Sequence, residues 1–158
     1  LLPHASAIPW MICTLGGVLF QSKPQEGGFY LLYLGEIDKT IFMSITTDLL
    51  TTEVILSDTQ IKHIQSHHPN IFERYCTYLT HMIEFPDYVI EANLPNTALI
   101  LKSFYEYGEQ FKLILRLQTS NDPNHYKNSV ITFMKIDEKE WNRLLRNKKV
   151  LYKSKNIG

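Results

Sequence analysis

Between residues 53 and 84 the apolar residues recur every three or four positions, which is the period of an α-helix. The pattern predicts one short strand and then two helices, over 53–56, 58–68 and 70–84. Ser57 and Gln60 have the spacing of a capping box at the start of the first helix. Pro69 ends that helix, because proline has no backbone N–H and its ring clashes with the preceding turn.

After residue 86 the period of the apolar residues changes to two, as in a β-strand with one buried face. Strands are predicted over 87–92, 97–104, 111–119, 128–136 and 150–154, with a helix over 137–147 before the last. The connections between the middle strands are short and polar, which favours antiparallel pairing. The predicted fold class is α+β, with N-terminal helices packed on an antiparallel sheet of four or more strands.

Alternation along the strand over 111–119 separates two faces of this sheet. Phe111, Leu113 and Leu115 point to one side, which we interpret as the core. Lys112, Ile114 and Arg116 point to the other. Five polar residues are candidates to converge on one open face of the sheet: Lys102, Arg116, Thr132, Tyr152 and Lys153.

Residues 1–52 give a weaker pattern. A strand is predicted over 29–34 and a short helix over about 38–45, after a turn or linker over 22–28. The chain does not begin with Met, so the first 28 residues are interpreted as a leader, a linker or an added segment. The sequence therefore divides into an unassigned leading segment, 1–52, and one domain, 53–158.

The composition is that of a globular domain, with 44% hydrophobic and 20% charged residues in 158. The net charge is zero, so the chain as a whole is not a strongly basic nucleic-acid binder. Residues 1–100, however, hold 4 Lys and Arg against 10 Asp and Glu, a balance of −6. Residues 101–158 hold 12 against 6, a balance of +6, which suggests one basic face.

Two cysteines, Cys13 and Cys76, are too few for a disulfide scaffold and are interpreted as buried thiols in a reducing compartment. The apolar run over 8–20 is too short to span a bilayer, which needs roughly 20 residues, so no membrane contact is expected.

Three of the six histidines, His63, His67 and His68, lie at the end of the helix predicted over 58–68. His63 and His67 are four residues apart and share a helix face, a spacing that can bind zinc, but the Glu of the metalloprotease pattern and a third ligand are missing. A capping or packing role before Pro69 is a second interpretation. The third is acid–base catalysis, because the pKa of histidine suits proton transfer at neutral pH.

Histidines beside a basic sheet suit RNA cleavage without a metal, which needs a base, an acid and cations for the phosphorane. His63 or His68 could transfer protons. Arg116 could hold the phosphate, together with Lys102 or Lys153. Thr132 could donate a hydrogen bond to a non-bridging oxygen.

Several motifs together resemble phage-encoded nuclease domains of the barnase/EndoU/colicin/RelE superfamily, over about 53–155. They are "LSDTQIKHIQSHHP", "MIEFPDYVIEA", "NTALILKSF", "FKLILRLQT" and "KNSVITFMKIDEKEWNRLLRNKKVLYKSK". The resemblance implies a barnase/RelE-like fold and a metal-independent endoribonuclease without a cofactor, which leaves a 2′,3′-cyclic phosphate. The family pattern falls on His63, His68, Arg116, Ser129, Thr132 and Lys153, with Lys102, Ser129 and Tyr152 as expected substrate-binding residues.

The resemblance also implies the biological setting. Such domains occur in prophages and polymorphic toxins, act on RNA in the bacterial cytoplasm after delivery from another cell or expression from the prophage, and are often opposed by an immunity or antitoxin protein. The neutral charge favours a narrow substrate, such as one tRNA loop.

Two alternatives stay open. One is a non-catalytic nucleic-acid- or protein-binding module of a phage or mobile element, with structural histidines. The other is a zinc-dependent hydrolase that uses His63 and His67.

Overall fold

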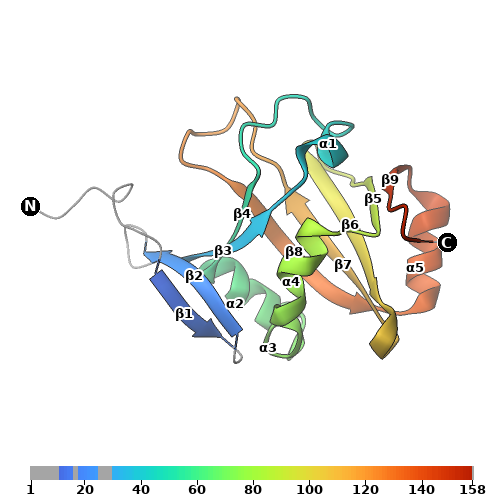
Figure 1. Cartoon of the computed structure of the whole chain (residues 1–158), viewed down its shortest axis with the longest axis horizontal. Helices are drawn as coiled ribbons and strands as arrows, with labels where there is room; N and C mark the ends of the chain where they lie inside the picture. Colours follow the sequence, from blue (N-terminus) through green and yellow to red (C-terminus); the bar gives the residue numbers. More distant parts are fainter. Residues whose placement is uncertain (1–10, 16–17, 25–29, 158) are drawn as a thin grey trace, which may run out of the picture.

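The computed structural model of the chain describes residues 11–15, 18–24 and 30–157. Within this part, nine strands form one sheet in the order β1-β2-β3-β4-β8-β7-β6-β5-β9 (Figure 1). The strands are β1 Met11–Leu15, β2 Val18–Pro24, β3 Tyr30–Glu36, β4 Glu53–Ser57, β5 Tyr88–Glu91, β6 Thr97–Phe104, β7 Glu109–Arg116, β8 Asn128–Ile136 and β9 Val150–Lys153. Most of the turn predicted over 22–28, and Cys13's side chain, lie outside the described residues.

Two groups of helices flank the sheet. The helices are α1 Lys39–Phe42, α2 Asp58–His67, α3 Ile71–Tyr75, α4 Leu79–Glu84 and α5 Glu138–Asn147, with 3-10 turns η2 Cys76–Tyr78 and η3 Tyr105–Tyr107. α4 lies in front of the sheet in Figure 1, whereas α5 lies at the right beside β9. The predicted strands β6 and β8 have the predicted bounds, and the helix predicted over 70–84 is divided into α3, η2 and α4.

The predicted fold is confirmed as α+β but needs two corrections. The sheet is mixed, because β4 pairs with β8 in parallel through Val54↔Asn128 and Ile55↔Ser129. The helices are also not N-terminal, since β1 to β4 and α1 precede α2. A parallel pair needs a long crossover connection, and here the chain between β4 and β8 contains α2, α3, α4 and three strands. Local periodicity predicts each strand but not a partner so distant in sequence.

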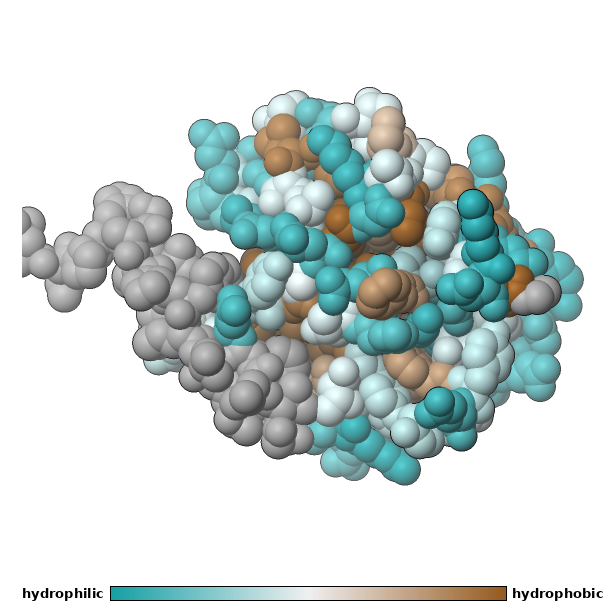
Figure 2. Space-filling model, viewed as in Figure 1, coloured by the Kyte–Doolittle hydropathy of each residue, from teal (hydrophilic) through white to brown (hydrophobic). Residues whose placement is uncertain are grey.

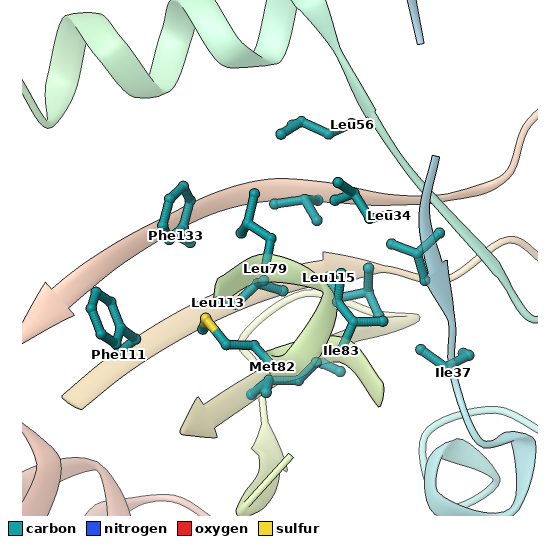
Figure 3. Packing of buried hydrophobic residues seen from close by; sticks show 14 of the residues in the cluster. Leu34, Ile37, Leu56, Leu79, Met82, Ile83, Phe111, Leu113, Leu115 and Phe133 are labelled. Atoms are coloured by element: carbon teal, nitrogen blue, oxygen red, sulfur yellow. The ribbon is translucent and has the colours of Figure 1, made fainter. Parts of the chain in front are cut away.

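The main core lies between the sheet and the helices α2, α3 and α4. Leu79, Met82 and Ile83 point from α4 toward the sheet, as Figure 3 shows. We call this side of the sheet the first face, and Phe111, Leu113 and Leu115 of β7 lie on it as predicted. Other buried residues of this cluster come from the strands on either side: Leu34, Leu56 and Phe133.

The opposite side of the sheet, which we call the second face, is only partly covered. Trp141 and Leu144 of α5 pack over β5, β6 and the end of β8, in a cluster with Ile90, Leu101 and Ile136. Helix α5 covers the second face at β5, β6 and the end of β8. The second face of β3, β4 and the first part of β8 lies beside the connection over 117–127.

Residues 30–52, part of the segment left unassigned by the sequence, join the same core. Leu32 and Leu34 of β3 are buried in it, and so are Phe42 and Leu49. β3 pairs with β4 over five residue pairs from Leu31↔Ser57 to Glu36↔Glu53. This part of the leading segment is therefore packed into the domain that follows it.

Hydrophilic and apolar residues alternate over the face seen in Figure 2, without a broad apolar patch among the residues that are coloured. In the described part of the chain, none of the helices has the length and apolar character needed to cross a bilayer.

Candidate functional site

The helix that carries the three histidines begins at a true N-cap. The Ser57 side chain accepts a hydrogen bond from the Gln60 backbone N–H at 3.1 Å. The second half of the predicted capping box is absent, because the Gln60 side chain donates instead to the carbonyl of Ile131 in β8. β4 pairs with β8 only at Asn128 and Ser129. Helix α2 contacts β8, and the hydrogen bond from Gln60 connects this helix to β8 at Ile131.

His63 and His67 lie on the exposed side of α2. Their ring centroids are 4.1 Å apart with the ring planes tilted by 34°, and His67 Nδ1 is 3.0 Å from the carbonyl oxygen of His63. Among the described residues no group of three His, Cys, Asp or Glu side chains could hold a metal ion. The zinc interpretation of this pair therefore gains no third ligand from the described chain.

His68 differs from the other two because it is half-buried. It caps the C-terminus of α2, where its backbone N–H donates to the carbonyl of Ile64 at 2.8 Å. Burial lowers the pKa of its imidazole below 6.5, and the nearby His67, Lys112 and His63 lower it further, because each disfavours a second positive charge. A neutral imidazole at pH 7 can accept a proton.

Three cross-strand pairs of β7 and β8 form a strip on the second face. The pairs are Lys112↔Met134, Ile114↔Thr132 and Arg116↔Ser129. Cross-strand partners project to the same side of a sheet, so Thr132 and Ser129 share the face of Lys112 and Arg116. At about 3.3 Å per residue, roughly 13 Å separates Lys112 from Arg116 along β7. The predicted Arg116, Ser129 and Thr132 are thus brought together. We call these three pairs the strip.

The hydroxyl of Thr132 in the strip is unusual in its hydrogen bonding. Its Oγ1 is buried and has no hydrogen-bond partner among the described residues. Native proteins rarely leave such a group unsatisfied, and exceptions often have a functional reason. The unsatisfied hydroxyl therefore makes Thr132 a candidate site residue.

Glu140 of α5 holds two cations at the end of the strip. Its carboxylate accepts hydrogen bonds from Arg143 Nε and Nη2, both at 2.7 Å, and lies 3.4 Å from Lys112 Nζ. The hydrogen bonds from Arg143, and then the charges of Lys112 and Arg143, lower the pKa of Glu140 to about 2. The carboxylate stays ionised and fixes the Lys112 ammonium on the second face. Lys112 was not selected from the sequence, although its alternation with Arg116 was the available signal.

At the other end of the strip, Arg116 lines a cavity of about 400 Å³. Its guanidinium makes an ion pair of 2.9 Å with Asp122 and also donates to the carbonyl of Leu117. The cavity is lined by Leu31, Ile55, Ser57, Arg116, Leu117, Gln118, Asp122, His125, Tyr126, Lys127 and Ser129. Sequence reasoning missed His125 and Tyr126, because a polar connection has no periodicity that would single them out.

The connection over 117–127 is held in place from both ends. Asp122 accepts a hydrogen bond from the Thr119 N–H at 2.8 Å. This hydrogen bond and the charge of Arg116 lower the pKa of the Asp122 carboxyl, although burial opposes them. Asn128 is fully buried and makes three hydrogen bonds: from the Gln118 N–H at 2.8 Å, and to the carbonyls of Thr51 and Glu53 at 2.7 and 3.0 Å. Asn128 therefore joins this connection to the segment before β4.

Three of the predicted residues do not join the strip. Lys102 pairs with Phe111 and Tyr152 pairs with Val89, so both lie on the first face. The Lys102 ammonium is also occupied by Asp87 at 3.0 Å and by the carbonyl of Phe85 at 2.7 Å.

Lys153 lies on the second face but far from Arg116. It belongs to β9, three strands from β7, which corresponds to about 14 Å at the usual strand spacing. Its ammonium is 6.0 Å from the ring centroid of Tyr88, which packs on Trp141 of α5, so α5 covers the sheet between Lys153 and the strip. The expected convergence of five polar residues on one face is therefore wrong for Lys102, Tyr152 and Lys153.

Comparison with known proteins gives one match. Neither the curated proteins nor the solved structures contain a match to the chain. The family model described as "phage-Barnase-EndoU-ColicinE5/D-RelE like nuclease2" matches residues 33–153, which include the second half of β3, the histidine helix, the strip and α5. This confirms the resemblance drawn from the motifs, and the chain belongs to this family of phage-associated nucleases.

Proposed function

We propose that this nuclease-family chain is an endoribonuclease that needs no metal ion and cleaves by attack of the ribose 2′-OH. The observation that supports it best is His68, a half-buried imidazole with a lowered pKa, near the Lys112 end of a strip that also carries Thr132 and Arg116. A base, cations and a hydrogen-bond donor are the groups that this reaction requires.

In the proposed reaction, a neutral His68 removes the proton from the 2′-OH, and the oxygen forms a bond to phosphorus. The bond from phosphorus to the 5′-oxygen breaks, and His63 acts as the acid that supplies the proton this oxygen needs. The products are a 2′,3′-cyclic phosphate and a 5′-hydroxyl. Lys112 and Arg116 offset the charge of the phosphorane, and the Thr132 hydroxyl donates to a non-bridging oxygen.

The neutral net charge supports a narrow substrate rather than RNA in general, so tRNA is the first substrate to examine. We also propose that the chain acts as a toxin-like effector in the bacterial cytoplasm and that an immunity or antitoxin protein blocks it. The phage association of the family supports this setting.

The test is cleavage of total tRNA and of a short structured RNA in EDTA, with detection of the cyclic phosphate. Wild type is expected to cleave, and His68→Ala to be slower by about 10²- to 10⁴-fold. The matched control is His81→Ala, since His81 of α4 also has a pKa lowered by burial but lies beside Lys102 and Asp87, which are not part of the strip.

A second experiment replaces the ribose at the cleaved position by 2′-deoxyribose. This should stop cleavage, because the 2′-OH nucleophile is then missing. RNA that stays intact with the folded wild-type chain would reject the proposal and favour a binding module. Equal rates for wild type and His68→Ala would reject the role of His68.

A further inference from the structure

The cavity beside Arg116 has features that catalysis at the strip does not use. Leu31 of β3 and Ile55 of β4 contribute apolar side chains from the second face of the sheet. The connection over 117–127 contributes the other walls, with Tyr126 half exposed at 50%. A hollow of about 400 Å³ is within the range of sites for small organic molecules.

The aromatic groups at this cavity are of a kind that binds nucleobases. The rings of His125 and Tyr126 are perpendicular, with centroids 4.9 Å apart, and both side chains are exposed. RNA bases that are out of a helix stack on aromatic rings and on the planar guanidinium of arginine. Arg116 is also only partly exposed, at 34% of its side chain, beside the same cavity.

The walls of the cavity are held in the unbound chain. Asp122 is fixed by Arg116 and Thr119, and Asp48 accepts hydrogen bonds from both the N–H and the hydroxyl of Ser120. Asn128 fixes the end of the connection. A preformed pocket loses less conformational entropy when it binds a flat ligand than a loop that must first become ordered.

The cavity and the strip share two residues. Arg116 and Ser129 line the cavity and also form the last pair of the strip. The preceding pair, which contains Thr132, lies about 7 Å away along the strands. A phosphate bound at Thr132 would therefore have the base of a neighbouring nucleotide within reach of Tyr126.

We propose that this cavity is a base-binding subsite: it takes one unpaired nucleobase next to the scissile phosphate and gives the enzyme its sequence preference. The inference rests on the proposed function. Tyr126 stacks on the base, Leu31 and Ile55 contact its edge, and Arg116 links the base site to the phosphate site.

The first experiment compares short single-stranded RNAs that differ only in the base on either side of the cleaved bond, with one abasic substrate for each position. Wild type is expected to prefer one base at one position. Tyr126→Ala should lower kcat/KM for that substrate by about 5- to 150-fold and remove the preference, whereas Tyr126→Phe keeps the ring and should retain it. For the abasic substrate at that position, wild type and Tyr126→Ala should cleave equally.

The matched control is Tyr105→Ala, because Tyr105 is also an exposed tyrosine but does not line this cavity. Its kcat/KM should match wild type for every substrate. If wild type cleaves without preference, or if Tyr126→Ala keeps the preference, the subsite is wrong while the nuclease proposal stands.

A binding experiment separates failure of the subsite from failure of the nuclease proposal. The four nucleoside 3′-monophosphates and inorganic phosphate are titrated into the whole chain and followed by NMR. Shifts of the Ile55 methyl and Tyr126 ring signals with a nucleotide, but not with phosphate, are expected even if no RNA is cleaved. Absence of these shifts with all four nucleotides would overturn the subsite.

Discussion

Replacement of Thr132 by valine should make the protein more stable and less active. The buried Oγ1 of Thr132 has no hydrogen-bond partner among the described residues, so folding removes it from water without compensation. In proteins such a buried hydroxyl costs about 1–3 kcal/mol. Valine has nearly the same shape, and we expect Thr132→Val to raise the free energy of unfolding by about 1–2 kcal/mol. For a chain of this length this corresponds to roughly 2–8 °C in Tm.

The stability assay is urea unfolding at pH 7, followed by circular dichroism, together with thermal unfolding. The matched control is Thr97→Val, because Thr97 is also a buried threonine of the sheet, but its hydroxyl donates to the carbonyl of Pro95 at 2.9 Å. This variant should lose about 1 kcal/mol. If Thr132→Val is destabilised like the control, its hydroxyl has a partner and the reasoning fails.

The activity assay gives the other half of the prediction. If the Thr132 hydroxyl donates to the phosphate in the transition state, Thr132→Val should lower kcat by about 10-fold or more, with little change in KM. Thr132→Ser keeps the donor and should keep most of the rate. A stabilised Thr132→Val with full activity would show that the unsatisfied hydroxyl has no catalytic role.

Three further predictions concern single side chains. Asn128→Ala removes three buried hydrogen bonds and should lower the free energy of unfolding, measured in urea, by about 3 kcal/mol. Asn124→Ala, at an exposed position of the same connection, should change it by less than about 0.5 kcal/mol. Because the pKa of Glu140 is about 2 in the folded chain and 4.5 in the unfolded one, stability should fall as the pH drops from about 4.5 to 2, and acid titration of Glu140→Gln should show a smaller fall. NMR titration should place the pKa of His68 below 6.5. Because the unfolded chain then binds this proton more tightly than the folded chain, the free energy of unfolding should decrease as the pH falls below 6.5. His68→Gln should lack this contribution to the pH dependence.

Most elements could be predicted from local patterns. The alternation over 97–104 and 128–136 gives strands with the observed bounds, and Ser57 caps α2 as its position suggests. These features depend on residues close in sequence, through side-chain alternation and the first turn of a helix. The partners of the strands depend on distant residues, which is why the parallel pairing of β4 with β8 was not predicted.

The candidate site shows the same division. Arg116, Ser129 and Thr132 were selected from the sequence and do share the second face, because the register of β7 and β8 pairs them. Lys102 was also selected, but its register with Phe111 puts it on the first face. A shift of one residue reverses the face of a strand side chain, and alternation along one strand carries no information on the register with the next.

The sequence by itself determined the family, the histidine helix and the two faces of β7, since each depends on motifs or on local periodicity. Only the tertiary structure decided which groups meet. It brought Lys112 to Glu140 of α5 and left the Thr132 hydroxyl without a hydrogen-bond partner among the described residues. It also placed Tyr126, in the connection over 117–127, at the same cavity as Ile55. These contacts join residues of different strands and helices, so they depend on strand register and helix placement, which follow from packing of the whole core rather than from any local pattern.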